Sequence, residues 1–211
     1  MRSRLPLTPE ITPLCEKVCR LKSILKDSRI LLALGANEPS SAGPPKATVE
    51  AAISALAKGP MQLLSVSRFY TTPAFPPGIG PDFVNAAVVV SCTLSPSALL
   101  TRLHQIEANF GRKRTKRWQS RTLDIDLLAY GNQVFPDPAT VRHWVELDLS
   151  EQKVATPDQL ILPHPRLQDR GFVLIPLCDI APDWRHPLLG STVAEMVTAL
   201  PEAEKADIRP L

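Results

Sequence analysis

Two aspartates stand two residues apart in an apolar segment, RTLDIDLLAY (residues 121–130), which has the composition of a β-strand. Strand side chains alternate between the two faces, so Asp124 and Asp126 are expected to point to the same face. Neighbouring carboxylates repel each other, and each is unfavourable to remove from water. Mg²⁺ would balance them, since it typically takes one or two carboxylates together with substrate phosphates. The alternative is that both aspartates pair with arginines on a solvated sheet face.

A basic segment directly precedes this strand. The run RKRTKRWQSR (112–121) contains six Arg and Lys residues and no acidic residue. Arginine suits bidentate phosphate contacts, and lysine acts as a point charge. Aspartates that hold a metal beside converging arginines are typical of phosphoryl transfer, where catalysis depends on positioning and charge neutralisation. Taken alone, the run could also be a solvated loop or a nucleic-acid patch, and Arg170 could add a cation or form only a surface ion pair.

Other polar residues allow two interpretations each. His164, between two prolines, could contact a phosphate or ribose, or only nearby backbone. Glu107 could accept a hydrogen bond from a hydroxyl or pair with an arginine of the basic run. Asn85 stands among apolar residues, where a buried amide needs partners, and it could read the edge of a polar heterocycle. Phe83 and Phe172 are most simply core aromatics. The chain has no G-x-x-x-x-G-K-[ST] motif, so a nucleotide would be held without a P-loop.

Hydrophobic periodicity predicts the elements that position these residues. The expected elements are a buried strand at 29–37, a helix at 46–58, strand-like runs at 62–72 and 82–93, a helix from 95 to about 110, and the aspartate strand at 121–130. This βαββαβ order predicts an α+β, ferredoxin-like fold, in which two helices cover one face of an antiparallel sheet. We expect residues 1–28 to form an extension with a short amphipathic helix, and 29–211 to form the domain.

Beyond this core the pattern weakens. Residues 135–162 form an expected insertion without clear periodicity, a loop then leads to a short helix, and 191–200 are expected to form a final helix. The 22 prolines are spread through the chain and indicate many rigid loops.

The composition is that of a soluble globular protein with one local anion site. Of the 24 basic residues, six lie in the run at 112–121, and the remaining 18 face 21 acids, so the rest of the chain is acidic. The four cysteines include no C-x-x-C, which favours a reduced, cytoplasmic setting. No apolar run is long enough to span a membrane, and residues 1–28 lack the apolar stretch of a secretory signal.

Seven segments occur together in the order and approximate spacing of one enzyme family. They are LLALGAN, FYTTP, DFVNAAVVV, IEANFGRKRTKRW, RTLDIDLLAYGN, LPHPRLQDRGFVLIPL and IAPDW, between about residues 29 and 200. In this combination the chain resembles the 6-hydroxymethyl-7,8-dihydropterin pyrophosphokinases of folate biosynthesis. The resemblance implies transfer of a pyrophosphoryl group from ATP to the pterin hydroxymethyl oxygen, with two Mg²⁺ ions and release of AMP.

The resemblance also implies roles for individual residues. Asp124 and Asp126 match the metal ligands, with Arg112 and Arg121 beside them in catalysis. The residues that match ATP-binding positions are Glu107, Arg114, Arg117, Trp118, Leu127, His164 and Arg170. The residues that match the pterin site are Thr72, Pro73, Phe83, Asn85 and Phe172, of which the two phenylalanines would sandwich the ring. No side chain is expected to act as a nucleophile, so transfer would be direct, and the chain is expected to act as a monomer or weak homodimer.

Two positions depart from the family pattern. Gln119 stands where a small residue commonly follows the loop tryptophan, which puts loop closure in question. His104 stands where a glutamine that contacts adenine is common. Three rival interpretations remain: a nucleic-acid-binding module that uses the basic run, although Trp118 is its single aromatic; an inactive relative that binds pterin; and another ATP-dependent transferase on the same fold.

Overall fold

The computed structural model describes residues 29–74, 80–112, 121–148, 151 and 155–211. The N-terminal extension at 1–28, with its expected helix, lies outside the described residues. The same holds for 75–79 in the Pro/Gly loop and for 113–120 in the basic run.

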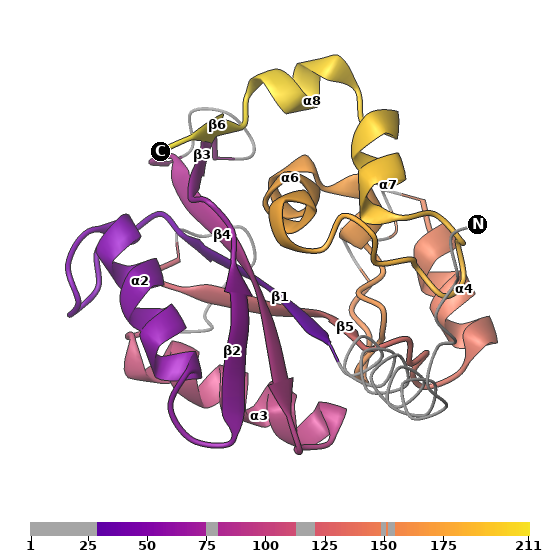
Figure 1. Ribbon diagram of the computed structural model, residues 1–211, viewed down its shortest axis with the longest axis horizontal. Coiled ribbons are helices and arrows are strands. Elements are labelled where there is room, and N and C mark those ends of the chain that lie inside the picture. The colour runs from indigo at the N-terminus through magenta and orange to yellow at the C-terminus, as the bar shows by residue number, and fades with distance from the viewer. Residues whose placement is uncertain (1–28, 75–79, 113–120, 149–150, 152–154) are drawn as a thin grey trace, which may run out of the picture.

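A single antiparallel sheet organises the described part of the chain (Figure 1). Its strands are β1 (Ile30–Ala36), β2 (Met61–Val66), β3 (Tyr70–Thr72), β4 (Phe83–Cys92), β5 (Asp124–Tyr130) and β6 (Arg209–Pro210). The order across the sheet is β5-β1-β4-β3-β6, and β2 also pairs with β4. The strand β5, which carries both aspartates, is therefore an edge strand of this sheet, and its neighbour is β1.

Two helices cover one face of this sheet, as the sequence predicts. They are α2 (Pro45–Leu56) and α3 (Pro96–Asn109). The Ser95 hydroxyl accepts the Ala98 N–H at the start of α3, and Gly111 follows its end with φ +83°, a conformation that favours glycine. Leu99, Leu103 and Ile106 of α3 are buried against the sheet. The ferredoxin-like βαββαβ core is thus confirmed.

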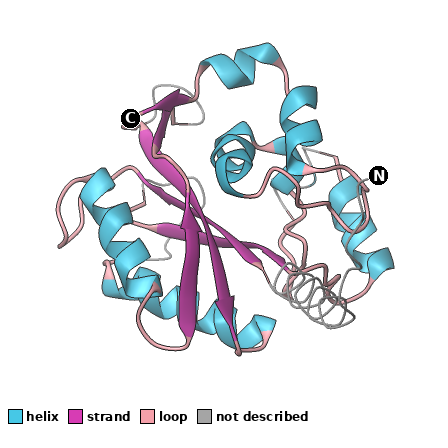
Figure 2. Cartoon of the chain, viewed as in Figure 1, coloured by secondary structure: helices cyan, strands magenta, loops and turns pink. Residues whose placement is uncertain are grey.

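A third helix, α6 (Gly171–Ile180), covers the opposite face of the sheet (Figure 2). Its Val173, Leu174 and Leu177 share a second buried cluster with Ala87 and Val89 of β4. The chain continues through α7 (Val193–Ala199) and α8 (Glu202–Ala206) into β6, which pairs with β3. The expectation of helices on one face therefore holds for the βαββαβ core, while the C-terminal part adds a layer on the other face.

The segment expected to lack regular structure contains a helix, α4 (Pro138–Glu146). The Asp137 side chain accepts the N–H groups of Ala139 and Thr140, which caps it. An isolated antiparallel bridge pairs Phe135 with Leu162, so the two ends of the expected insertion lie side by side. A short 3₁₀ helix, η1 (Leu167–Asp169), precedes α6.

The strand expected at 62–72 is divided by Ser67. The Ser67 N–H donates to the Ala87 carbonyl, and the Ser67 hydroxyl accepts the Ala87 N–H at 2.9 Å. The side chain thus replaces a backbone group in the ladder and separates β2 from β3. Within the described residues, no helix has both the length and the apolar character that crossing a bilayer requires.

Candidate active site

The two aspartates of β5 lie on the sheet face that α6 covers. In the pairing of β1 with β5, Asp124 lies opposite Gly35 and Asp126 opposite Ala33. Ile125, between them, is buried in the core on the α2–α3 side. The sequence prediction that both carboxylates share one face is therefore confirmed.

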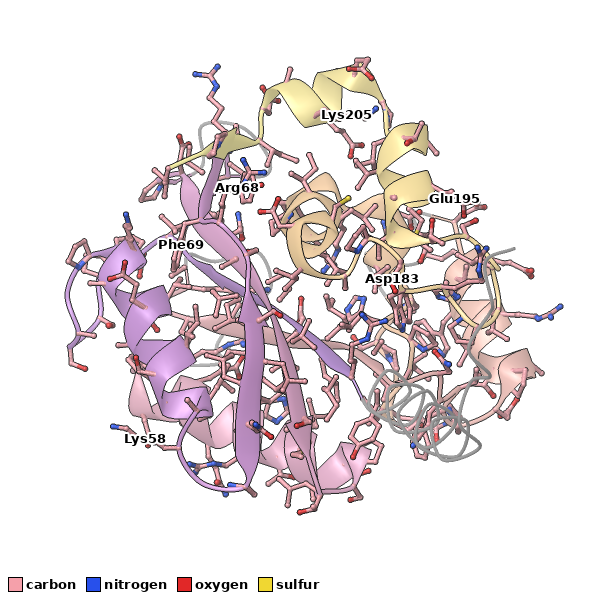
Figure 3. All side chains as sticks on the ribbon, in the orientation of Figure 1. Lys58, Arg68, Phe69, Asp183, Glu195 and Lys205 are labelled. Atoms are coloured by element: carbon pink, nitrogen blue, oxygen red, sulfur yellow. The ribbon has the colours of Figure 1, made fainter. Side chains whose placement is uncertain are left out.

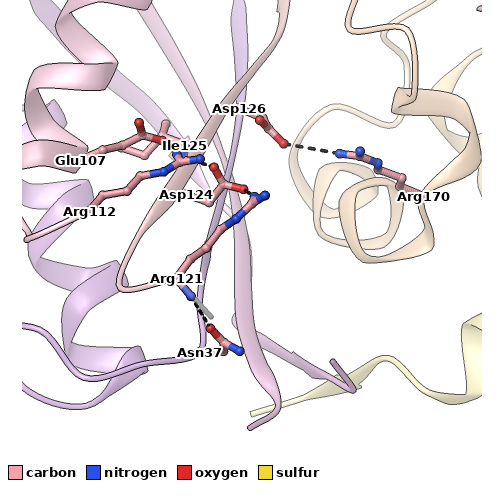
Figure 4. A network of polar contacts seen from close by, with 8 residues as sticks. All are labelled: Asn37, Glu107, Arg112, Arg121, Asp124, Ile125, Asp126 and Arg170. Atoms are coloured by element: carbon pink, nitrogen blue, oxygen red, sulfur yellow. Dashed lines mark hydrogen bonds and ion pairs between the residues drawn. The ribbon is translucent and has the colours of Figure 1, made fainter. Parts of the chain in front are cut away.

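Three arginines surround these carboxylates (Figure 4). Asp124 forms ion pairs with both Arg112 and Arg121. Asp126 pairs with Arg170, at 3.5 Å between Oδ2 and Nη1. Two of these cations come from the ends of the basic run, and the third comes from the N-terminal end of α6. The site thus brings together all four residues expected to be catalytic, and Arg170 with them.

Glu107 supports this cluster from α3. It is 1 % exposed, pairs with Arg112, and accepts the Ile125 N–H at 2.8 Å. One carboxylate therefore holds both an arginine and the strand that carries the aspartates. Of the two interpretations of Glu107, the structure shows the ion pair with an arginine of the basic run. The predicted contact of Glu107 with ATP stays a prediction.

Asn37 is a site residue that the sequence reasoning missed. Its Oδ1 accepts the Arg121 N–H at 2.7 Å, and its own N–H donates to the Arg121 carbonyl. Its Nδ2 also donates to the carbonyl of Pro81, two residues before the start of β4. The signal that could have identified it is an amide directly after a predicted buried strand, at the end of the LLALGAN segment.

The charges of the cluster shift the protonation of its members. Burial alone would raise the pKa of Asp126, but His164 and Arg170 nearby outweigh it and hold this pKa below its usual value. Burial lowers the pKa of His164 to about 4, against the pull of Asp126. Burial, followed by repulsion from Arg112, lowers the pKa of the Arg121 guanidinium. At neutral pH the site therefore presents an ionised Asp126 and a neutral imidazole.

The imidazole of His164 is oriented by its own loop. Its Nδ1 accepts the Arg166 N–H at 3.1 Å, so the neutral ring carries its proton on Nε2. The His164 N–H donates to the Leu128 carbonyl of β5, which fixes this loop beside the aspartate strand.

Three of the five residues expected to bind the pterin, Thr72, Phe83 and Asn85, lie on the sheet face that carries the aspartates. Asn85 is 6 % exposed and donates from Nδ2 to the Thr72 hydroxyl at 2.8 Å. A Cβ added to Gly35 would lie 2.8 Å from Asn85 Oδ1, so the glycine gives the amide its space. Phe83 is half-buried, two residues before Asn85 on β4.

Phe172 does not behave as a core residue. It lies in the first turn of α6 with 41 % of its surface exposed, and the Arg170 guanidinium carbon is 5.7 Å from its ring centroid. The simplest interpretation of Phe172, as a core aromatic, is therefore wrong. An exposed aromatic that already stacks on a cation is available to a planar ligand.

The remaining predicted residues are less informative. Arg114, Arg117, Trp118 and the divergent Gln119 lie outside the described residues. Leu127 is buried in the core on the α2–α3 side, so its side chain and those of the aspartates lie on opposite faces of β5. Pro73 is exposed directly after β3, and His104 is half-buried on α3. The predicted contacts of these residues with ATP and pterin stay predictions.

Comparison with known proteins gives one consistent family. The model of the family described as 7,8-dihydro-6-hydroxymethylpterin-pyrophosphokinase (HPPK) matches residues 31–182. A 2-amino-4-hydroxy-6-hydroxymethyldihydropteridine pyrophosphokinase of Pseudomonas aeruginosa is 36 % identical over 174 residues, which is 82 % of this chain and 92 % of that protein. A protein of the same name from Synechocystis sp. is 39 % identical over 131 residues, covering 62 % of this chain and 56 % of its own length.

Solved structures support the fold. A crystal structure of a double mutant of Plasmodium falciparum HPPK-DHPS, with pterin and p-hydroxybenzoate, superposes with a TM-score of 0.62 at 14 % identity. The match covers 86 % of this chain and 46 % of that one. The chain therefore spans less than half of this solved protein, and a little over half of the Synechocystis relative.

Proposed function

Because the chain belongs to the 7,8-dihydro-6-hydroxymethylpterin-pyrophosphokinase family, we propose that it transfers a pyrophosphoryl group from ATP to 6-hydroxymethyl-7,8-dihydropterin. The products are the pterin diphosphate and AMP, and the reaction belongs to folate biosynthesis. The observation that carries the proposal is the pair of same-face aspartates on β5, set among Arg112, Arg121 and Arg170.

The aspartates fit Mg²⁺. Their oxygens already face positive charge, and hard carboxylate oxygens are the ligands that Mg²⁺ prefers. Among the described residues no three His, Cys, Asp or Glu side chains gather as a metal site. Two carboxylates are nevertheless enough for a cation that also binds substrate phosphates. We propose that Asp124 and Asp126 together hold two such ions, which would neutralise the triphosphate and activate its β-phosphorus.

The chain's own residues supply the rest of the chemistry. Arg112, Arg121 and Arg170 lie beside the aspartates (Figure 4). There they would contact the oxygens of a triphosphate and oppose the charge that grows on the leaving AMP oxygen. Phe83 and Phe172 hold the pterin ring between them, and the Asn85 amide reads its edge. The pterin hydroxyl attacks directly, and Asp124 is placed to accept its proton.

The proposal also covers the setting of the enzyme. We expect a monomer or weak homodimer in the cytoplasm, without affinity for nucleic acid. Sedimentation velocity measures the oligomeric state. Filter binding to DNA and RNA at ~150 mM salt measures the affinity for nucleic acid, because purely electrostatic binding by the basic run is weak at this salt concentration.

One product analysis tests the proposed reaction. The protein is incubated with ATP, MgCl₂ and the reduced pterin alcohol, and the nucleotide products are separated. Formation of AMP that depends on the pterin, in equal amounts with the pterin diphosphate, is the expected result. Formation of ADP would indicate a one-phosphoryl transfer, and no pterin-dependent product would contradict the proposal altogether.

A further inference from the structure

Helix α6 is held across the sheet by an ion pair at each end. At its N-terminal end, Arg170 pairs with Asp126 of β5. At its C-terminal end, Asp179 pairs with Arg68, which lies two residues before the start of β3. In the sheet order, β1 and β4 lie between these two strands. The helix that carries Phe172 is therefore anchored on both sides of the site.

The Asp179 anchor is made of four hydrogen bonds. Oδ1 accepts from Arg68 Nη2 at 2.7 Å. Oδ2 accepts from Arg68 Nε at 3.1 Å, from the Arg68 backbone N–H at 3.2 Å, and from the Tyr70 hydroxyl at 2.8 Å. Tyr70 is 2 % exposed, and the Asp179 side chain is 19 % exposed. A carboxylate that accepts from a guanidinium and a buried phenol is a strong, directional contact.

The pKa values agree with this geometry. Burial would raise the pKa of Asp179, but hydrogen bonds from Arg68 and Tyr70 outweigh it and lower this pKa. Burial, together with the hydrogen bond to Asp179, raises the pKa of Tyr70 to about 12. The anchor therefore has one charge state across the working pH range.

The anchor touches the strand that forms the pterin side of the site. Tyr70 is paired directly with Asn85, and Thr72, two residues on, is paired with Phe83. Asp179 and Phe172 are seven residues apart on α6, about 10 Å along its axis and on nearly the same face. One helix face thus carries an aromatic ring at one end and, at the other, a carboxylate fixed to the strand beside Asn85.

We propose that Asp179 is a positioning residue that sets the gap between Phe172 and the Phe83–Asn85 side of the site by fixing α6 to Arg68 and Tyr70. The inference rests on the proposed function, since it takes the pterin as the occupant of that gap. The two anchors differ in one respect: the proposed cation would compete with Arg170 for Asp126, whereas nothing in the reaction competes for Asp179. The C-terminal anchor therefore keeps α6 in position over the sheet when Arg170 leaves Asp126 and binds a substrate phosphate.

The experiment measures pterin and nucleotide binding separately in Asp179→Asn, which keeps the shape of the side chain and removes its charge. Isothermal titration with the pterin, in MgCl₂ and a non-hydrolysable ATP analogue, is expected to show a Kd raised about tenfold, as loss of a charged hydrogen bond would give. The Kd of the ATP analogue should stay within twofold. In turnover, KM for the pterin should rise while kcat at saturating pterin changes little.

Matched variants separate positioning from stability. Tyr70→Phe removes one of the four hydrogen bonds and should raise the pterin Kd by about threefold. Asp179→Glu should recover part of the affinity. Asp183→Asn removes the charge from another carboxylate–arginine pair, with Arg29 at 3.2 Å, and should leave both constants unchanged. Arg68 and Asp183 lie on opposite sides of α6 in the view of Figure 3.

The outcomes are distinct. An unchanged pterin Kd in Asp179→Asn and Tyr70→Phe would overturn the inference, and so would equal losses of pterin and nucleotide affinity. A fall in kcat with unchanged KM would show a smaller folded fraction and no positioning role. If the unaltered protein itself binds no pterin, the proposed function fails first and the inference falls with it.

Discussion

Three guanidinium groups converge on two carboxylates at the centre of the site, and each cation has a different second attachment. Arg112 is also held by the buried Glu107, and the backbone of Arg121 is held by Asn37. Arg170 lies against the Phe172 ring. The three arginines thus balance Asp124, Asp126 and Glu107, and in the proposed reaction each arginine would turn toward a phosphate when a cation binds the aspartates.

Replacing either aspartate should stop the reaction without unfolding the protein. We expect Asp124→Ala and Asp126→Ala each to lower kcat by at least about a hundredfold, the effect of removing a preorganised electrostatic group. For Asp124→Ala, the free energy of unfolding should fall by only about 1–2 kcal/mol. Arg112 retains its ion pair with Glu107, and the Arg121 side chain, which is 39 % exposed, can be hydrated once its partner is removed. Kinetics and urea unfolding measure both quantities, and substantial turnover in both variants would refute the metal-ligand assignment.

Arg121 should affect turnover far more than pterin affinity. In Arg121→Ala the backbone hydrogen bonds to Asn37 remain, so the segment before β5 stays in place. Only the guanidinium that we propose to oppose charge on the leaving group is lost, which should lower kcat by about a hundredfold. The pterin Kd should change less than about threefold. Equal losses in both constants would assign Arg121 to ground-state binding, and Arg121→Lys, which lacks the planar fork, should recover little.

At the scale of elements, the residues that sequence reasoning placed correctly are those fixed by alternation along strands. The shared face of Asp124 and Asp126 follows from period two alone. The missed features depend on partners distant in sequence. Ser67 breaks a continuous strand pattern because its hydroxyl replaces a ladder group opposite Ala87. Helix α4 is a different case, because local signals for it were present and were overlooked: Asp137 and Pro138 at its start, and Val141, Trp144 and Val145 at helical spacing.

Strand β1 contributes to the site a residue without a side chain, Gly35, which lies between Asn85 of β4 and Asp124 of β5. In Gly35→Ala the new methyl would lie 2.8 Å from Asn85 Oδ1, so the amide must turn away from Thr72. We expect a pterin Kd raised at least about tenfold and an unfolding free energy lowered by about 1–3 kcal/mol, as for an overpacked core.

A double variant identifies the cause of the Gly35 effect. In Gly35→Ala/Asn85→Ala the clashing group is gone, so the loss of stability should be smaller than the sum of the two single losses. Pterin affinity should stay low, because the Asn85 amide that we propose to bind the pterin edge is also gone. Strict additivity of the unfolding free energies would show that the methyl acts elsewhere. Chemical denaturation and titration with pterin measure the two quantities.

At the scale of the whole molecule, the site forms where the βαββαβ core meets a second layer. The core order could be predicted because each of its elements has its own period and its own turn signals. The position of α6 on the opposite face could not, since its ten residues, GFVLIPLCDI, are apolar almost throughout and show no polar side. The same layer places the edge strand β6 against β3, a pairing of two residues that no local pattern signals.

This second layer also contains a buried histidine that should make folding sensitive to acid. His186 is fully buried, its Nδ1 accepts the N–H groups of Leu188 and Leu189, and its ring packs edge-on against Trp184. Its Nε2 has no hydrogen-bond partner among the described residues. Burial lowers the pKa of His186 from 6.5 to about 4, so the folded protein holds this ring neutral.

The sign of the effect follows from linkage. Below pH 6.5 His186 is protonated in the unfolded chain, whereas in the folded protein it stays neutral down to about pH 4. The free energy of unfolding therefore decreases as the pH falls from 6.5 to about 4. The loss should reach about 2 kcal/mol by pH 5 and about 3 kcal/mol by pH 4. In His186→Asn, an amide oxygen can replace Nδ1 as acceptor without titrating. Urea unfolding at pH 7 and pH 5 should therefore show a smaller pH-dependent loss in the variant than in the unaltered protein, and equal losses in the two would assign the acid sensitivity to other groups.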